Sequence, residues 1–376
     1  MLNLIRLNNF KAFRELTLEL APLTLLSGLN GVGKSTTLQA LSLLRQSADA
    51  GTLSTEGLLL NGDLVNLGTG QDVLHEDYAT IEGRAAEISI TLENQAGESR
   101  EWTTAYAKDN DLLAYSTSDR SKGETQTPDW NIFRQGFQYL RADRIVPAVS
   151  YPKSFDAAIR RRFLGARGEH TVNYLRHHSD DHITNVACRH PSSASDKLPD
   201  QVAAWMSEFC PGVNLSAHDL EGTETVRLSF GFFGTAGASA SNRYRPTNVG
   251  FGLTYVLPVI VAALSSAPDD LLLIENPEAH LHPRGQTRMG QLLADAAAGG
   301  AQLIIESHSD HLLNGLRLAV KGGDLTPDDT AIHYFDRADR GEISVVHPRI
   351  SSEGMLSHWP PGFFDEWDRA LDALLD

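Results

Sequence analysis

The sequence predicts an α/β protein with a mixed, mostly parallel sheet, and three observations lead to this class. Near the start of the chain, an apolar strand pattern is followed by a glycine-rich stretch and an amphipathic helix. Near its end, two further apolar strand patterns alternate with helices. Segments that alternate strictly between polar and apolar residues lie in the first third. A chain of 376 residues is long enough for one large domain or two smaller ones.

The first predicted part, residues 1–140, combines the glycine-rich stretch with an antiparallel β subdomain. Its expected elements are strands over 2–10 and 15–28, a helix from Lys34, two strands around a turn at Gly97, and an exposed loop over 108–129. The strands follow from the alternation of polar and apolar residues, and the loop from a polar stretch without periodicity.

Three further parts are expected along the chain. Residues 141–248 predict an inserted, arginine-rich helical lobe that ends in a strand and a small-residue loop over 234–242. Residues 249–340 predict helix, strand, helix and strand, and so complete the main sheet. Residues 341–376 predict a strand and a C-terminal helix.

Bulk composition narrows the class of protein. A net charge of -16 argues against broad, nonspecific coating of nucleic acid or anionic membrane. Two cysteines cannot form a disulfide framework, and we expect a reducing cytoplasm. The longest apolar run, residues 253–264, is shorter than the roughly 18 residues of a membrane span and contains Pro258. It predicts a buried helix, and no membrane segment is expected.

The glycine-rich stretch, GLNGVGKS over residues 28–35, matches the pattern G-x-x-x-x-G-K-[ST] in full. In such a loop, glycines let backbone N–H groups turn inward around phosphates at a helix N-terminus. The lysine bridges the outer phosphate oxygens, and the serine hydroxyl holds Mg²⁺. The predicted ATP-binding residues here are Gly28, Asn30, Gly31, Gly33, Lys34, Ser35 and Thr36.

Five further segments lie in an order that resembles a known group of ATPases. They are NNFKAF near the start, LGTGQDVLHE with Gln71, NVGFGLTY over 248–255, LLLIENPEAHLHP over 271–283, and IIESHSDHLL with His308. Together with the glycine loop they resemble ABC-type ATPases of the AAA group, specifically SMC- and RecF-like heads and the ATPase part of the overcoming-lysogenization-defect nucleases. The resemblance covers most of the chain and implies an ABC-type ATPase head.

The resemblance implies roles for individual residues. Gln71 would touch Mg²⁺ and the attacking water, and Ser35 and Glu275 would hold the metal. Asn248, Gly250 and Gly252 would cap the γ-phosphate bound in the opposite protomer, so that a homodimer sandwiches two ATP molecules. His308 would act as the switch histidine. The alternatives stay open: Gln71 as a polar loop residue, residues 248–252 as a plain helix start, and His308 as a core histidine.

The acidic strand departs from the usual pattern of two consecutive acids. Glu275 takes the place of the acid that holds Mg²⁺, and Asn276 takes the place of the one that polarises water. An amide orients water but cannot accept its proton. Glu278 is the nearest spare carboxylate, and the alternative is a structural acid that caps the next helix. The predicted catalytic residues are therefore Glu275, Asn276, Glu278 and His308, with slow turnover.

Basic residues concentrate between Arg141 and Arg176, with eight positive and three negative residues. Arg160, Arg161 and Arg162 at its centre predict a face for nucleic acid or a partner, or an ordinary solvated helix face. The histidine-rich residues 177–190 fit no standard zinc spacing and predict a polar loop.

The expected function is an ATP-gated switch that controls a separate effector, such as a nuclease. A role in anti-phage defence is expected by analogy with the family alone. The tail after His308 is too short for the Toprim nuclease domain of the related proteins. It ends in WPPGFFDEWDRAL, residues 359–371, which resembles an uncharacterised C-terminal segment. A RecF-like DNA-binding ATPase and a non-hydrolysing, ATP-dependent scaffold are the alternatives.

Overall fold

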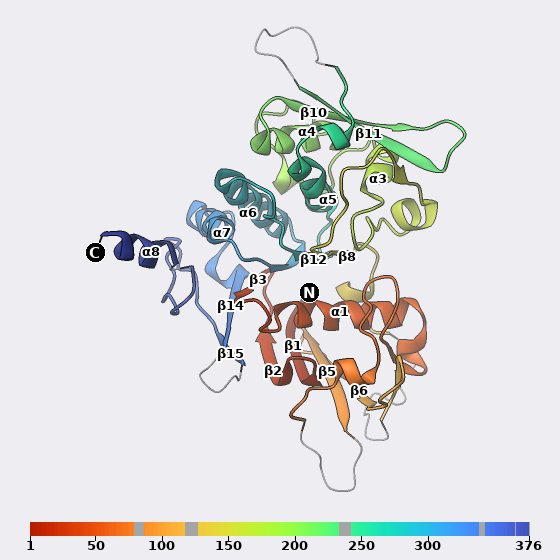
Figure 1. The fold of residues 1–376 in the computed structure, drawn as a ribbon, viewed down its shortest axis with the longest axis vertical. Coiled ribbons are helices and arrows are strands. Elements are labelled where there is room, and N and C mark those ends of the chain that lie inside the picture. The colour runs from red at the N-terminus through yellow and green to blue at the C-terminus, as the bar shows by residue number, and fades with distance from the viewer. Residues whose placement is uncertain (79–85, 117–126, 233–241, 338–342, 365, 376) are drawn as a thin grey trace. The chain divides into compact units, whose positions relative to one another are not determined.

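A computed structural model describes residues 1–78, 86–116, 127–232, 242–337, 343–364 and 366–375. The chain divides into two compact units (Figure 1). The first unit comprises Met1–Arg134, Thr330–Arg349 and Ser357–Asp376, and the second comprises Gln135–Asp329 and Ile350–Leu356. This division differs from the predicted boundaries, because residues 141–248 and most of 249–340 belong to the same unit.

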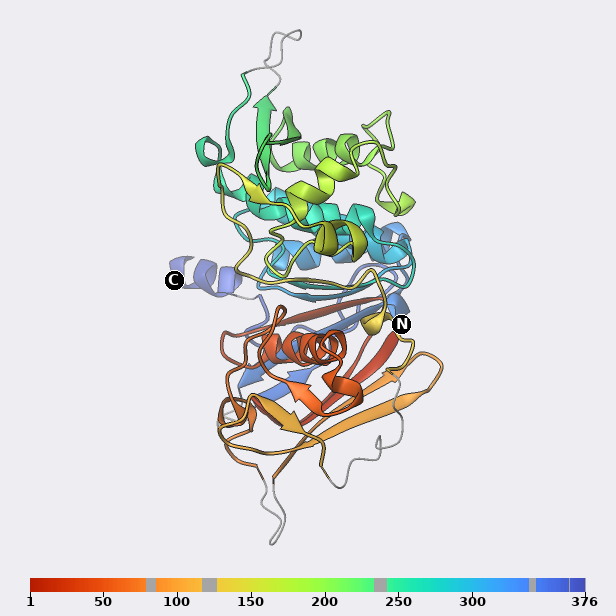
Figure 2. The same ribbon diagram turned by 90° about the vertical axis from the view of Figure 1, so that its right-hand side faces the viewer.

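The first unit contains an antiparallel sheet and the strand that leads into the glycine-rich loop. Its described strands are β1 (Leu2–Phe10), β2 (Phe13–Glu19), β3 (Leu23–Gly28), β4 (Gly57–Leu59), β5 (Glu87–Asn94), β6 (Ser99–Ala105), β7 (Leu112–Ala114), β14 (Thr330–Arg337) and β15 (Ile343–Val346). Its helices are α1 (Lys34–Asp49), α2 (Gly70–Val73) and α8 (Glu366–Leu375). An antiparallel sheet has the order β2-β1-β5-β6, and Figure 2 shows its strands β5 and β6 in orange.

Strand β3 carries the chain into the glycine loop. It is buried at every position except Gly28, as expected for a strand covered on both faces. Strand β14 pairs with it in parallel and β15 pairs with β14 antiparallel. The predicted strand, glycine loop and helix over residues 23–49 are therefore confirmed.

The second unit is built around three parallel strands. Its strands are β8 (Gln138–Leu140), β9 (Tyr151–Pro152), β10 (Val213–Asp219), β11 (Thr225–Phe232), β12 (Leu271–Glu275) and β13 (Gln302–Glu306). Its helices are α3 (Thr171–His177), α4 (Leu198–Phe209), α5 (Phe251–Ser265), α6 (Pro283–Ala298) and α7 (Asp310–Gly322). Strand β12 pairs in parallel with β8 and β13, which brings the end of each strand to one edge.

Helices α5, α6 and α7 lie beside one another in the second unit (Figure 1). The apolar run at residues 253–264 forms most of α5 and is buried throughout, with Pro258 inside the helix. Among the described residues, no helix has both the length and the apolar composition needed to cross a membrane.

Three expectations need correction. Residues 108–129 are not only a loop, because β7 lies within them and pairs with β4. The lobe predicted as helical also holds an antiparallel sheet of order β10-β11-β9. Residues 177–190 are not a simple polar loop, because Cys188 and His190 are buried there. The small-residue loop over 234–242 lies almost entirely outside the described residues.

Candidate nucleotide site

The glycine loop (residues 28–35, from here the phosphate loop) follows β3 and leads into α1. Gly28 has a φ of 138°, and a Cβ there would lie 2.0 Å from the Phe335 carbonyl oxygen of β14. Gly33 has a φ of 87°, and a Cβ there would lie 2.6 Å from the Phe13 ring. Only glycine fits both the left-handed backbone and the close approach, so the loop shape is set by packing on its neighbours.

Lys34 is the first residue of α1 and is only 3% exposed. Its ammonium donates hydrogen bonds to the carbonyl oxygens of Gly28, at 3.0 Å, and Leu29. The first turn of α1 holds no acidic residue. A helix N-terminus and a cation held at the loop together form a preformed site for an anion.

Gln71 lies in the same unit, in the single turn of α2. Its backbone N–H donates to the Lys108 carbonyl at 3.0 Å, and the residue is exposed. Nearby, Lys11 donates to the Gln39 side chain of α1 at 2.6 Å, and burial lowers the pKa of Lys11. The turn that contains NNFKAF therefore packs on the helix that follows the phosphate loop.

Glu275 ends β12 in the second unit, and two donors fix its carboxylate. The Tyr139 hydroxyl donates to one oxygen at 2.6 Å, and the Ala142 backbone N–H donates to the other at 2.8 Å. Burial, followed by the charge of Glu275, raises the pKa of Tyr139 well above its usual value, so the phenol keeps its proton. A carboxylate oriented in this way retains lone pairs for a cation or its water.

Asn276 follows in a left-handed conformation, with a φ of 44°. Its N–H donates to the Glu306 carbonyl at the end of β13, at 2.7 Å. Its side-chain oxygen is buried and has no hydrogen-bond partner among the described residues. Buried polar atoms without a partner are rare and call for water or a ligand, so this oxygen fits the predicted role of orienting water.

Glu278 is 7% exposed, and one of its oxygens accepts a hydrogen bond from the His308 backbone N–H at 2.9 Å. Burial raises the pKa of Glu278. His308 itself is exposed, directly after β13. The helix α6 is capped by His282, not by Glu278. Glu278 therefore holds the start of the segment that carries the predicted switch histidine.

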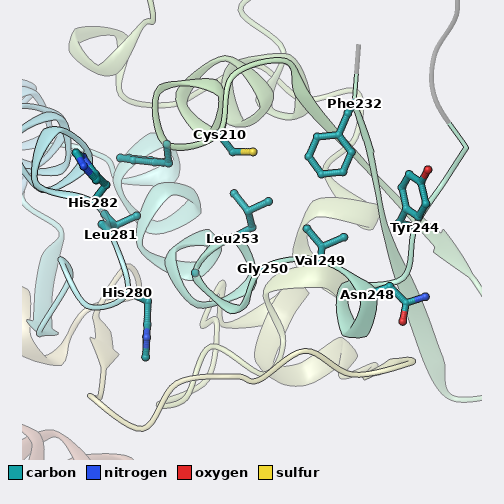
Figure 3. A pocket seen from close by; sticks show the side chains of 12 residues that line it. Cys210, Phe232, Tyr244, Asn248, Val249, Gly250, Leu253, His280, Leu281 and His282 are labelled. Carbon is teal, nitrogen blue, oxygen red and sulfur yellow. The ribbon is translucent and has the colours of Figure 1, made fainter. Parts of the chain in front are cut away.

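The predicted signature residues Asn248, Gly250 and Gly252 surround the start of α5, whose first turn has no acid. They line one side of a cavity of about 550 Å³ together with Phe232 and Leu253 (Figure 3). Its other side is the turn over residues 280–282. The His280 ring contacts Phe251 at a tilt and Tyr255 edge-on, both in α5, with centroid distances of 4.7 and 5.0 Å.

The three central arginines do not form one open basic face. Asp156 pairs with both Arg160 and Arg161. Arg162 has a φ of 53° and donates to the Tyr174 hydroxyl at 3.1 Å, so it points into the second unit. These local ion pairs favour the interpretation of the three arginines as part of an ordinary helix face.

The histidine-rich segment shows no metal geometry. His190 contacts Glu208 at 3.1 Å, and Glu208 also accepts from Arg288. No group of three or more His, Cys, Asp or Glu side chains arranged to hold a metal occurs among the described residues.

ATP and Mg²⁺ fit the residues present. In the first unit, the phosphate loop supplies a buried cation and a helix N-terminus, and Ser35 supplies a hydroxyl in the first turn of α1. In the second unit, Glu275 supplies an oriented carboxylate. Hard cations such as Mg²⁺ prefer such oxygen ligands. A phosphate loop between a buried strand and a helix defines the class of P-loop nucleotide-binding proteins.

Comparison with known proteins gives the family. Residues 23–314, more than half of the chain, match the family described as "AAA domain, putative AbiEii toxin, Type IV TA system", so the chain belongs to that AAA family of ATPases. Residues 325–374 match a second family, described as "Protein of unknown function (DUF3696)". This match covers the predicted uncharacterised C-terminal segment. No curated protein matches the chain.

Three solved structures, all SMC heads, are similar to the chain. The SMC head bound to the C-winged helix domain of ScpA has 14% identity and a TM-score of 0.44, over 92% of this chain and 97% of that one. The SMC head domain from Thermotoga maritima has 11% identity and a TM-score of 0.42, over 92% and 98%. The Smc head with an extended coiled coil from Pyrococcus furiosus, bound to the C-terminal domain of ScpA, has 12% identity and a TM-score of 0.46, over 100% of each.

Sequence reasoning missed the residues that hold Glu275 and Asn276 in place. Tyr139, Arg144 and Tyr255 all contact this turn or its supports. Tyr139 and Arg144 lie between motifs, whereas Tyr255 ends the segment NVGFGLTY, which assigned it no role. The only other signal was that Arg144 belongs to the basic stretch. Nothing in its spacing distinguished a buried arginine from the exposed ones around it.

Proposed function

We propose that this chain binds ATP with Mg²⁺, hydrolyses it slowly, and uses the bound nucleotide to hold two copies together as a switch for a partner effector. The observation that carries the proposal is the phosphate loop, where the buried Lys34 ammonium lies at the acid-free start of α1. Such a site is built before any ligand arrives, so little reorganisation opposes nucleotide binding.

The residues of the loop act on the phosphates. Lys34 would exchange its bonds to the loop carbonyls for the outer phosphate oxygens, and the N–H groups of the first turn would bind the inner ones. The Ser35 hydroxyl, Gln71 and Glu275 would hold Mg²⁺, which neutralises charge on the β- and γ-phosphates.

Hydrolysis needs water to attack the γ-phosphorus and break its bond to the β-phosphate oxygen. The buried Asn276 oxygen would accept a hydrogen bond from that water and orient it, but it cannot take the proton. Glu278 is the nearest spare carboxylate in the sequence, and its raised pKa suits a proton acceptor. Slow turnover is supported by Asn276, because the residue beside Glu275 orients the water but cannot take its proton.

Two copies would share each nucleotide. The exposed start of α5, with Asn248, Gly250 and Gly252, would cap the γ-phosphate held by the phosphate loop of the other copy. ATP then stabilises the dimer over the monomer by mass action, and hydrolysis releases it. A separate effector reads this state. The family description names a putative toxin of a Type IV TA system, and a role in anti-phage defence is proposed by analogy alone.

The test measures phosphate release and molar mass, with and without ATP, for the wild type and for Lys34→Ala and Glu275→Gln. We expect Lys34→Ala to lose ATP binding and ATP-dependent dimerisation, and Glu275→Gln to keep binding but lose turnover. Lys321→Ala, an exposed lysine on α7, is the matched control. An unchanged ATP affinity in Lys34→Ala would overturn the proposal.

A non-hydrolysing, ATP-dependent scaffold is the second candidate. It is favoured by Asn276 in the water-polarising place and by the bond between Glu278 and the His308 N–H. Dimerisation on ATP without phosphate release above background would select it.

A further inference from the structure

Arg144 ties down the backbone of the turn that follows β12. One of its terminal nitrogens donates to the Glu275 carbonyl at 2.5 Å, and the other donates to the Asn276 carbonyl at 2.6 Å. The planar guanidinium therefore bridges two consecutive peptide groups. A lysine ammonium cannot reproduce this fork, because it is a compact point charge.

This arginine is a buried cation, only 1% exposed. Burial lowers its pKa to about 10, which still leaves it charged at neutral pH, while Tyr255, Glu278 and Glu275 act in the opposite direction. Removing a charge from water costs free energy, and several contacts with the buried guanidinium must offset this cost. These contacts also fix the position of the guanidinium.

Tyr255 of α5 contacts both Arg144 and Ala142. The guanidinium lies 4.0 Å from the centre of the Tyr255 ring, a cation–π geometry. The Tyr255 hydroxyl donates to the Ala142 carbonyl at 2.6 Å, and the Ala142 N–H in turn donates to the Glu275 carboxylate at 2.8 Å. Tyr255 thus supports both the main chain of the turn, through Arg144, and its carboxylate, through Ala142.

We propose that Arg144 is the positioning residue of the Glu275–Asn276 turn, and that Tyr255 links this turn to the start of α5. The inference rests on the proposed function, in which Glu275 holds Mg²⁺ and Asn276 orients water. Arg144 touches neither substrate nor metal. It sets where the two side chains point by fixing the carbonyl groups on either side of Asn276.

The link through Tyr255 matters because each nucleotide is proposed to be shared between two copies. Tyr255 lies one helical turn beyond Phe251, where α5 begins at the proposed contact with the other copy. A shift of α5 on meeting that nucleotide would move the Tyr255 ring, and with it Arg144 and the turn. Each copy would thereby sense the ATP of its neighbour.

The test compares Arg144→Lys with Arg167→Lys, an exposed arginine paired with Asp143. Three quantities are measured: kcat with KM, ATP affinity with Mg²⁺ and with EDTA, and the thermal midpoint. We expect Arg144→Lys to lower kcat by roughly 10²-fold, the cost of a misplacement of about 1 Å. It should also lose the gain in ATP affinity that Mg²⁺ provides, and keep the affinity measured in EDTA. Arg167→Lys should match the wild type in all three.

Tyr255→Leu and Tyr255→Phe extend the test and cover a failure of Arg144→Lys to fold. Leucine removes both contacts, whereas phenylalanine keeps the ring beneath the guanidinium, so kcat should fall further with leucine. Losses in the double variant Arg144→Lys/Tyr255→Leu should be smaller than the product of the single losses, because the residues act through one contact.

Each outcome decides the matter. A folded Arg144→Lys with wild-type kcat and Mg²⁺ dependence overturns the inference and leaves the proposed function intact. A lower thermal midpoint with an unchanged kcat at 20 °C below it means a purely structural role, and also overturns it. A wild type that binds no ATP overturns the proposed function itself, and the inference with it.

Discussion

Asn276 is the residue on which the rate of the proposed reaction depends most directly. Its left-handed backbone, with a φ of 44°, is one that Asn adopts more readily than most residues. Its buried oxygen is held by no described group, so the side chain is available to water. An amide at this position suits a protein that keeps ATP bound for a long time before the ATP is hydrolysed.

Asn276→Glu should raise turnover, because it restores a carboxylate beside Glu275. We expect kcat to rise roughly tenfold or more, with a loss of about 1–2 kcal/mol in stability from the left-handed backbone. Phosphate release and thermal denaturation measure the two effects. Asn276→Gln is the matched control, since it has the same shape without the charge and should give no rise.

Glu278→Gln tests the remaining candidate base. Glutamine keeps an oxygen for the His308 N–H but cannot take a proton. We expect kcat to fall by roughly 10²–10⁴-fold at unchanged ATP affinity. Since burial raises the pKa of Glu278, wild-type kcat should also fall as the pH drops through a range above the ordinary carboxyl value of 4.5. Wild-type turnover in Glu278→Gln would restrict the residue to holding the His308 segment.

At the scale of elements, the sequence predicted most of what periodicity can encode. Strands β1, β3, β12 and β13 and helices α1, α5 and α8 are where apolar spacing placed them. The short strands β4, β7 and β8 were missed. Each has only three residues, too few for a period, and each exists because a distant partner pairs with it.

The candidate site was predictable only where a contiguous motif encodes it. The phosphate loop could be read directly, because its backbone shape requires glycine at fixed places. The contact between Arg144 and the Glu275 carbonyl joins residues 131 positions apart, and no local pattern records it. The pairing of Arg160 and Arg161 with one acid likewise depends on helix geometry that charge counting cannot resolve.

Strand β14 contains a buried histidine that should make stability depend on pH. His333 is 2% exposed, its Nε2 bonds to the Glu19 carbonyl at 2.7 Å, and its Nδ1 lies 2.7 Å from Nδ1 of His347. The carbonyl can only accept, so Nε2 carries the proton, and Nδ1 accepts from His347. Burial, and then His347, lower the pKa of His333 to about 4.

The unfolded chain therefore binds a proton near pH 6.5, whereas the folded chain does so only near pH 4. Stability should fall as the pH drops through this window, by about 2 kcal/mol between pH 7 and pH 5. Urea denaturation at both values measures it. The difference should shrink in His333→Gln and persist in His358→Gln, an exposed control. An equal slope in His333→Gln would assign the effect to other groups.

At the scale of the whole molecule, the proposed sharing of nucleotide between copies makes a testable demand. Lys34→Ala removes the phosphate loop of a copy, and Asn248→Ala removes its γ-phosphate contact. Each alone should be inactive. A mixture should regain about a quarter of wild-type turnover, since half of the dimers are mixed and each mixed dimer has one intact site. Phosphate release from equimolar mixtures measures this, and silence in the mixture would contradict the shared arrangement.

The two family matches also meet at the phosphate loop. The C-terminal match, residues 325–374, includes β14, whose Phe335 carbonyl is the close neighbour of Gly28. Strand β14 of this segment of unknown function thus packs against the phosphate loop within the first unit. Changes in the C-terminal strands should therefore be assessed for nucleotide affinity as well as for partner binding.

The position of His280 has a practical consequence. Its imidazole contacts the rings of Phe251 and Tyr255, so their ring currents should displace its carbon-bound proton resonances in an NMR spectrum. The displacement of these resonances decreases steeply as the distance between the rings increases. A single labelled histidine signal would accordingly report, in solution and without any crystal, when α5 and the turn after β12 move apart.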